Sequence, residues 1–121
     1  TRLVRLLDKA HTRGVWQGDQ HIDNWTWDGD HFYLLDAASI HFEGQALSRA
    51  RRLKDIAGIC VTLPPVAEQV FRQCLMSAYL SDDRNQQQSI ADGLPAMTVR
   101  LQQQRVRRYY RKTRRNCTEF S

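Results

Sequence analysis

Three polar side chains, Asp19, Asn24 and Asp36, have the types and the spacing that phosphoryl-transfer chemistry needs. Carboxylate and amide oxygens are the ligands that Mg²⁺ prefers in proteins, so Asn24 and Asp36 are suited to hold this ion. A further carboxylate, that of Asp19, can then accept a proton from an incoming hydroxyl. In phosphoryl transfer a metal ion binds the phosphates, and a carboxylate positions the nucleophile.

A β-hairpin is expected to bring two of these residues together. Asn24 precedes the aromatic run 25–27, and Asp36 follows the apolar run 31–35. The Asp28-Gly29-Asp30 sequence between the two runs predicts a tight turn, and Asp-Gly favours type I′, in which both central residues have positive φ. Because a hairpin returns the chain to its starting point, Asn24 and Asp36 should be neighbours.

The remaining pattern predicts a mainly α fold. Apolar spacing indicates a helix over 1–13 that Gly14 ends in a left-handed cap, a loop over 15–24, and core helices within 46–80. A loop through Gly44 is expected to follow the hairpin. Pro64-Pro65 should start one of the core helices, and 81–93 is polar enough to predict a loop or frayed helix. A basic helix is expected over 96–115. We expect Cys60 and Cys74 to be small buried hydrophobes.

The central segment resembles a known family of kinases. Residues 14–24 read G-V-W-Q-G-D-Q-H-I-D-N, and a hairpin, an apolar pair and Asp follow. This order resembles the catalytic and metal-binding loops of eukaryotic-like kinases, and most closely those of small bacterial relatives with a G-D-x-H-x-x-N loop. Residues 49–59, R-A-R-R-L-K-D-I-A-G-I, are similar to the R-x-x-K-D-L-x-x-L helix of bacterial lipopolysaccharide core kinases. The arginine-rich segment 107–120 also resembles the C-terminus of that family, so the resemblance covers essentially the whole chain.

The resemblance implies a protein-kinase-like C-terminal lobe and a role for each residue of the loop region. Asp19 becomes the catalytic carboxylate, Asn24 a Mg²⁺ ligand, and Asp36 the main Mg²⁺ ligand. His21 would lie near the transferred phosphate, although a hydrogen bond that packs the loop is an equal alternative. Asp55 resembles the buried helix carboxylate that supports the catalytic loop. The sequence departs from the family pattern at Gln17, where His or Arg is usual, and at Ala37-Ala38, which replaces Phe-Gly.

The implied activity is ATP- and Mg²⁺-dependent phosphorylation of a sugar hydroxyl, on heptose or 3-deoxy-D-manno-octulosonic acid (Kdo), in the lipopolysaccharide inner core. The sequence contains no G-x-G-x-x-G motif and no Lys on a predicted strand. These features supply phosphate positioning and charge neutralisation in kinases. The N-terminal lobe is therefore absent from the 121 residues, and we expect this C-lobe to be nearly inactive without that lobe in cis.

The basic charge is confined to the C-terminal segment. Residues 100–121 carry eight Lys and Arg and one Glu, whereas residues 1–99 carry ten Lys and Arg and twelve Asp and Glu. A solvated basic face is the simplest interpretation. An acceptor-facing or membrane-facing surface comes next, and it fits a cytoplasmic enzyme that acts peripherally at the anionic inner face of the bacterial inner membrane. Its predicted members are Arg107, Arg108, Arg111, Arg114 and Arg115.

Two other function classes stay open. In one, the chain is a non-catalytic pseudokinase or binding module, in which Asp19 and Asp36 only organise the loop. In the other, it is a basic nucleic-acid-binding protein that uses residues 100–115. The second ranks lower because no recognisable nucleic-acid motif accompanies the charge.

Overall fold

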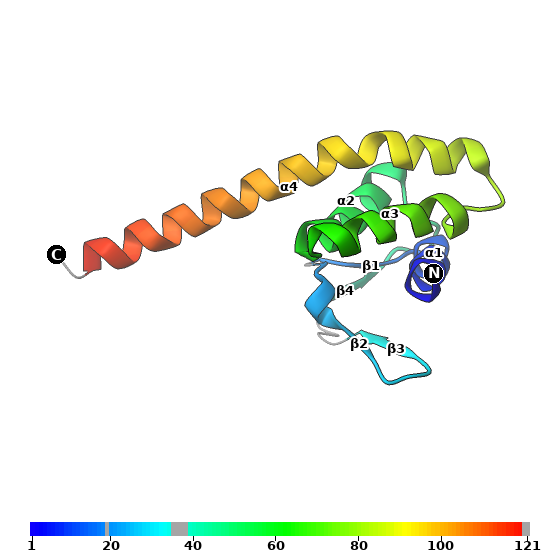
Figure 1. Ribbon diagram of the computed structural model, residues 1–121, viewed down its shortest axis with the longest axis horizontal. Helices are drawn as coiled ribbons and strands as arrows, with labels where there is room; N and C mark the ends of the chain where they lie inside the picture. Colours follow the sequence, from blue (N-terminus) through cyan, green and yellow to red (C-terminus); the bar gives the residue numbers. More distant parts are fainter. Residues whose placement is uncertain (19, 35–38, 120–121) are drawn as a thin grey trace.

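The computed structural model describes residues 1–18, 20–34 and 39–119. It is mainly helical with two small antiparallel sheets, as the sequence predicts at this coarse level. The helices form the body, and the last of them extends well beyond it (Figure 1). In chain order the elements are α1 (Arg2–Thr12), β1 (Val15–Gln17), the 3-10 helix η1 (Ile22–Asn24), β2 (Trp25–Trp27), β3 (Phe32–Leu34), β4 (Ile40–Phe42), α2 (Arg49–Thr62), α3 (Pro65–Ala78) and α4 (Arg84–Glu119).

Helix α1 ends as its sequence predicts. Val4, Leu7 and His11 form its buried face. Gly14, just beyond the helix, has a φ of 79°, a conformation that costs glycine little because it has no side chain. The carbonyl of Gly14 accepts a hydrogen bond from the N–H of Glu43 at 2.8 Å, so the turn also joins the helix end to a distant segment.

The first sheet lies in two segments that were expected to be loops. Strands β1 and β4 pair antiparallel, with Val15 opposite Phe42 and Gln17 opposite Ile40. The expectation of loops over 15–24 and through Gly44 is therefore wrong at these positions. Both strands have three residues, too short for alternation along the chain to reveal them, although their β-branched and aromatic residues favour strands.

The predicted hairpin is confirmed, but its turn differs from the expected type. Strands β2 and β3 pair antiparallel, with Trp25 opposite Leu34. The N–H of Asp28 donates to the carbonyl of His31 at 3.2 Å, so Gly29 and Asp30 are the central residues of the turn. Gly29 has a φ of 103°, but Asp30 is not among the described residues with positive φ, so the turn is not type I′. Instead, Oδ1 of Asp28 accepts hydrogen bonds from the N–H groups of Asp30 and His31, both at 2.8 Å. The side chain of Asp28 thus replaces part of the backbone turn geometry.

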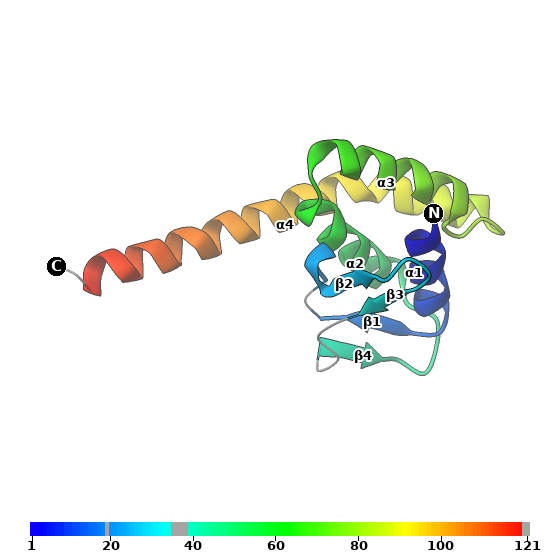
Figure 2. The same cartoon turned by 60° about the horizontal axis from the view of Figure 1, so that its bottom comes forward.

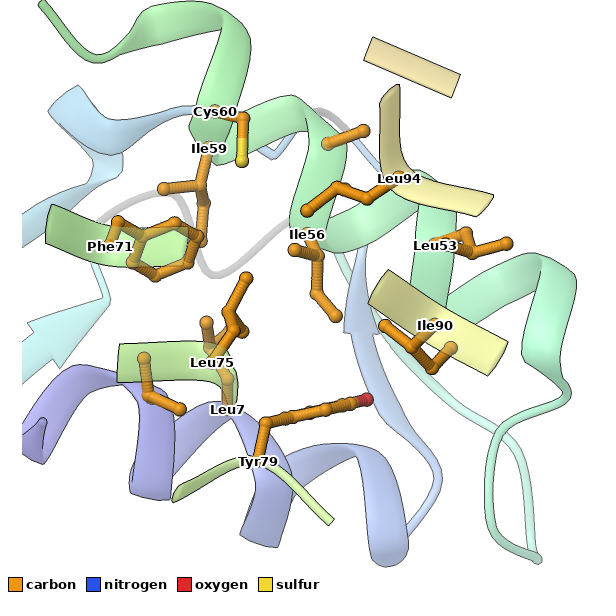
Figure 3. Packing of buried hydrophobic residues seen from close by; sticks show 12 residues of the cluster. Leu7, Leu53, Ile56, Ile59, Cys60, Phe71, Leu75, Tyr79, Ile90 and Leu94 are labelled. Carbon is orange, nitrogen blue, oxygen red and sulfur yellow. The ribbon is translucent and has the colours of Figure 1, made fainter. Parts of the chain in front are cut away.

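The core forms between four helices. Leu7 of α1, Ile56 of α2, Leu75 of α3 and Leu94 of α4 are each at most 5% exposed, and Figure 3 shows them among neighbours from all four helices. Pro65 occupies the first turn of α3, where the missing N–H costs nothing, as expected.

The two cysteines expected in the core differ in their burial. Cys60 is buried, as predicted, and burial raises the pKa of its thiol to about 12. Cys74 is only partly buried, but it packs against the core, so the expectation is confirmed in part.

Helix α4 corrects the expectation for residues 81–93. The helix begins at Arg84, so residues 84–93 are helical, whereas 81–83 lie outside the helix as predicted. Ile90 is 4% exposed and packs in the core, and the buried side chain of Gln87 donates a hydrogen bond to the carbonyl of Tyr79 at 2.8 Å. The tertiary contacts therefore stabilise a helix that its polar composition does not favour. Pro95 lies inside it and removes one backbone hydrogen bond.

The second half of α4 leaves the body (Figures 1 and 2). Val99, Val106 and Tyr110 are 51%, 54% and 64% exposed, so the apolar side chains of this half of the helix do not pack on the body. Helix α4 instead contacts α2 through its earlier residues, and a Cβ on Gly93 would lie 2.9 Å from Cδ1 of Leu53. Among the described helices, none has the length and apolar character needed to cross a membrane.

Candidate functional site

Asp55 is a buried carboxylate at the centre of the predicted site region. It lies on α2 and is 3% exposed. Its Oδ2 lies 2.5 Å from Nε2 of His11 at the end of α1. Its Oδ1 accepts hydrogen bonds from the backbone N–H of Gln17 at 3.4 Å and from Nε2 of Gln20 at 3.1 Å. Asp55 therefore connects α1 and α2 with the segment that contains Asp19.

A second layer of polar groups supports this carboxylate. Nδ1 of His11 lies 2.7 Å from the hydroxyl of Tyr79, which also accepts a hydrogen bond from Nη1 of Arg52 at 3.0 Å. Burial raises the pKa of the Tyr79 hydroxyl above its usual value, although Arg52 favours the opposite shift. The guanidinium of Arg52 also donates through Nε to the carbonyl of Leu47 at 3.0 Å. These buried groups are satisfied by one another, as burial of polar groups requires.

Gln20 links the loop to the hairpin. Its Oε1 accepts hydrogen bonds from Nε1 of Trp25 at 2.9 Å and from the N–H of His21 at 3.3 Å, while its Nε2 donates to Asp55. One amide side chain therefore holds the start of β2 and the helix α2 in a fixed relation. Its role was not predicted, because a single glutamine between charged residues carries no recognisable spacing.

Two further contacts hold the loop close to α2. The N–H of Ile22 donates to Oγ1 of Thr62 at 2.8 Å. A Cβ on Gly58 would lie 2.6 Å from the carbonyl oxygen of Gln20, a distance that atoms do not tolerate. Only glycine at position 58 allows the backbone of the loop to approach this face of the helix.

His21 and Asn24 lie at the two ends of η1. Nδ1 of His21 accepts a hydrogen bond from the N–H of Asp23 at 3.0 Å and so caps this short helix. This hydrogen bond supports the alternative in which His21 packs the loop. Asn24 is partly buried, and its N–H donates to the carbonyl of His21 at 3.0 Å.

Asp19 and Asp36 lie outside the described residues, but the chain on either side of them is described. The N–H of Gly18 donates to the carbonyl of Ser39 at 2.8 Å, next to the pairing of Gln17 with Ile40. At the other end, Leu34 pairs with Trp25, the residue after Asn24. Leu34, which precedes segment 35–38, pairs with the residue after Asn24. Ser39, which follows the segment, accepts the hydrogen bond from Gly18. Among the described residues, no group of three or more His, Cys, Asp or Glu side chains could hold a metal ion.

The predicted basic residues have different positions along α4. Arg108 lines a cavity of about 270 Å³ between the loop, α2 and α4, together with Arg51 and Lys54 of α2. Arg107 and Arg111 are exposed and line no described cavity. The side chains of Arg114 and Arg115 lie outside the described part.

Comparison with known proteins adds no relative: no family model, curated protein or solved structure matches the chain.

Proposed function

We propose that this chain is the C-terminal lobe of an ATP- and Mg²⁺-dependent kinase that phosphorylates a sugar hydroxyl of the lipopolysaccharide inner core. Asp19 positions the hydroxyl and accepts its proton, and Asn24 and Asp36 hold the metal. Mg²⁺, when bound, would position the phosphates and neutralise their charge. Amide and carboxylate oxygens are the ligands that suit it.

The observation that carries this proposal is the way the described chain flanks the two aspartates. Gly18, the residue before Asp19, is hydrogen-bonded to Ser39, and the residue after Asn24 is paired with Leu34. Asp36 lies between Leu34 and Ser39 in the sequence. The segment that contains Asp36 thus begins at a residue paired beside Asn24 and ends at a residue bonded beside Asp19, which supports the convergence that phosphoryl transfer requires.

The support of the loop by Asp55 also favours a catalytic role. The buried carboxylate of Asp55 accepts the backbone N–H of Gln17 at the end of β1 and the side-chain amide of Gln20, so it fixes the start of the following loop relative to the helix core. Preorganised loops of this kind are typical of sites that must hold reacting groups within fractions of an ångström. The sequence resemblance to lipopolysaccharide core kinases is what supports a sugar as the acceptor.

The proposed location is cytoplasmic, at the inner face of the bacterial inner membrane. Arg107 and Arg111 lie on an exposed part of α4, where their charges can approach anionic lipid headgroups. This position would bring the enzyme close to an acceptor anchored in the membrane.

The decisive experiment measures phosphate transfer from ATP to lipopolysaccharide core by the protein in which this chain is joined to its proposed N-terminal lobe. Asp19→Asn and Asp36→Asn should each lower the transfer rate about a hundredfold or more. Asp30→Asn is the matched control, because Asp30 lies in the exposed hairpin turn, and it should transfer at the wild-type rate.

Two results would contradict the proposal. Full activity in Asp19→Asn or Asp36→Asn would remove that residue from the site. Binding of Mg²⁺–ATP without transfer to any core sugar would favour the binding-module alternative.

A further inference from the structure

The cavity between the loop, α2 and α4 has a lining rich in positive charge. Its cationic side chains come from two helices that are distant in sequence: Arg51 and Lys54 from α2, and Arg105 and Arg108 from α4. Among the described residues, no ion pair joins Lys54, Arg105 or Arg108 to a carboxylate. Cations brought together by a tertiary fold repel one another, so an anion between them is stabilising.

Arg51 is held in place by aromatic stacking. Its guanidinium lies 3.7 Å from the centre of the Trp16 ring, and Trp16 in turn stacks on His41 with ring centroids 4.2 Å apart. Nε of Arg51 also lies 3.5 Å from Oε1 of Glu43. A guanidinium fixed on an aromatic face is preorganised, and less conformational entropy is lost when it binds an anion.

Two hydrogen-bond donors of the lining are buried without a partner. Gln17 is 3% exposed, yet neither Nε2 nor Oε1 has a hydrogen-bond partner among the described residues. Nε1 of Trp16 is also buried and has no hydrogen-bond partner among the described residues. Buried polar groups are normally satisfied, so these donors indicate a place where a ligand oxygen can bind. The carboxylate in the lining, that of Asp55, is already bonded to His11 and Gln20.

We propose that this cavity is an anion-binding site for a small acidic ligand, in which Arg51, Lys54, Arg105 and Arg108 hold a phosphate or carboxylate group and the amide of Gln17 donates to it. A volume of about 270 Å³ suits a ligand of monosaccharide size rather than a larger one. The proposal does not depend on phosphate transfer, because it concerns binding alone.

The test is calorimetric titration of the full 121-residue chain with four probes: inorganic phosphate, glucose 6-phosphate, glucuronate and glucose. We expect the charged probes to bind and neutral glucose to give no heat. Tighter binding of glucose 6-phosphate or glucuronate than of inorganic phosphate would identify the ligand as a sugar phosphate or a sugar acid. Equal binding of phosphate and glucose 6-phosphate would identify the free anion as sufficient.

A matched pair of double variants separates the site from the general charge of α4. Arg105→Gln with Arg108→Gln removes two cavity cations and should weaken binding at least about tenfold. Arg107→Gln with Arg111→Gln removes the same charge from positions of the same helix that do not line the cavity and should change the affinity less than about twofold. Gln17→Met should also weaken binding, because it removes the amide donor at nearly constant volume.

A measurement on the wild-type chain does not depend on the folding of any variant. Upon titration with the best probe, backbone amide shifts in nuclear magnetic resonance spectra should change around Gln17, Lys54 and Arg105 and not around Arg111. Equal losses in the two double variants, shifts spread along α4, or no binding of any charged probe would each overturn the proposal.

Discussion

Oδ2 of Asp55 lies 2.5 Å from Nε2 of His11, and both side chains are at most 2% exposed although 44 residues separate them in the sequence. The pair joins the end of the first helix to the middle of the second. The other oxygen of Asp55 accepts hydrogen bonds from Gln17 at the end of β1 and from Gln20 just beyond it. One carboxylate therefore determines how three segments meet, and its removal should have a large effect.

Asp55→Ala should lower the free energy of unfolding by about 3–5 kcal/mol, because His11, Gln20 and the N–H of Gln17 would lose a buried partner. Chemical denaturation monitored by circular dichroism measures this change. Asp92→Ala is the control, since Asp92 is exposed on α4 and bonds only to the neighbouring Gln88 among the described residues. Equal stability of the two variants would show that Asp55 has no structural role.

Tyr79→Phe tests the second layer of the network. The variant keeps the ring in the core but removes the hydroxyl that contacts His11 and Arg52, so it should destabilise the fold by about 1–3 kcal/mol. Tyr33→Phe provides the comparison, because the Tyr33 hydroxyl donates to Asp28 at an exposed position, and the change should be below about 0.5 kcal/mol. Thermal denaturation of both variants decides the matter, and a neutral Tyr79→Phe would contradict the expectation.

Gly58→Ala should displace the loop from α2. The added Cβ would lie 2.6 Å from the carbonyl oxygen of Gln20, so either the helix or the loop must move, at a cost of about 1–3 kcal/mol. Gly44→Ala is the matched control, because a Cβ there meets nothing within 4 Å, and its effect should stay below about 1 kcal/mol. Urea denaturation of the two variants gives the comparison. A Gly58→Ala variant as stable as wild type would mean that this close approach is not needed.

The hairpin turn predicts a pH dependence of stability. Hydrogen bonds from the N–H groups of His31 and Asp30, and from the Tyr33 hydroxyl, lower the pKa of Asp28 from 3.8 to about 2. Because the folded state favours the ionised form, this contribution to stability is fully present above pH 3.8 and is lost as the pH falls toward 2. The difference in melting temperature between wild type and Asp28→Asn should be constant above this window and shrink within it. A difference that does not vary with pH would contradict the prediction.

Local patterns in the sequence predicted several elements well. The apolar spacing of α1, its glycine cap, the Pro-initiated α3 and the hairpin all depend on neighbours in the chain, and all are present. The start of α4 was missed because Gln87 is buried through hydrogen bonds to the carbonyls of Leu75 and Tyr79, which polarity alone does not reveal. The spacing of Ile90 and Leu94 was the available signal.

In the candidate site, too, local sequence predicts some features and contacts between distant segments determine others. The order of Asp19, Asn24 and Asp36 and the supporting position of Asp55 could be proposed from the sequence, because motif spacing carries them. The contribution of Gln20, the pairing of β1 with β4 and the cavity beneath α4 depend on segments that are far apart in the chain. No window of sequence contains both sides of such a contact.

The length of α4 has a hydrodynamic consequence. Thirty-six helical residues extend about 54 Å at 1.5 Å per residue, whereas a compact chain of this size has a radius of gyration of about 14 Å. Since the second half of α4 extends beyond the body (Figures 1 and 2), rotation about the helix axis is faster than end-over-end tumbling. We therefore expect the chain to scatter X-rays in solution as an elongated particle.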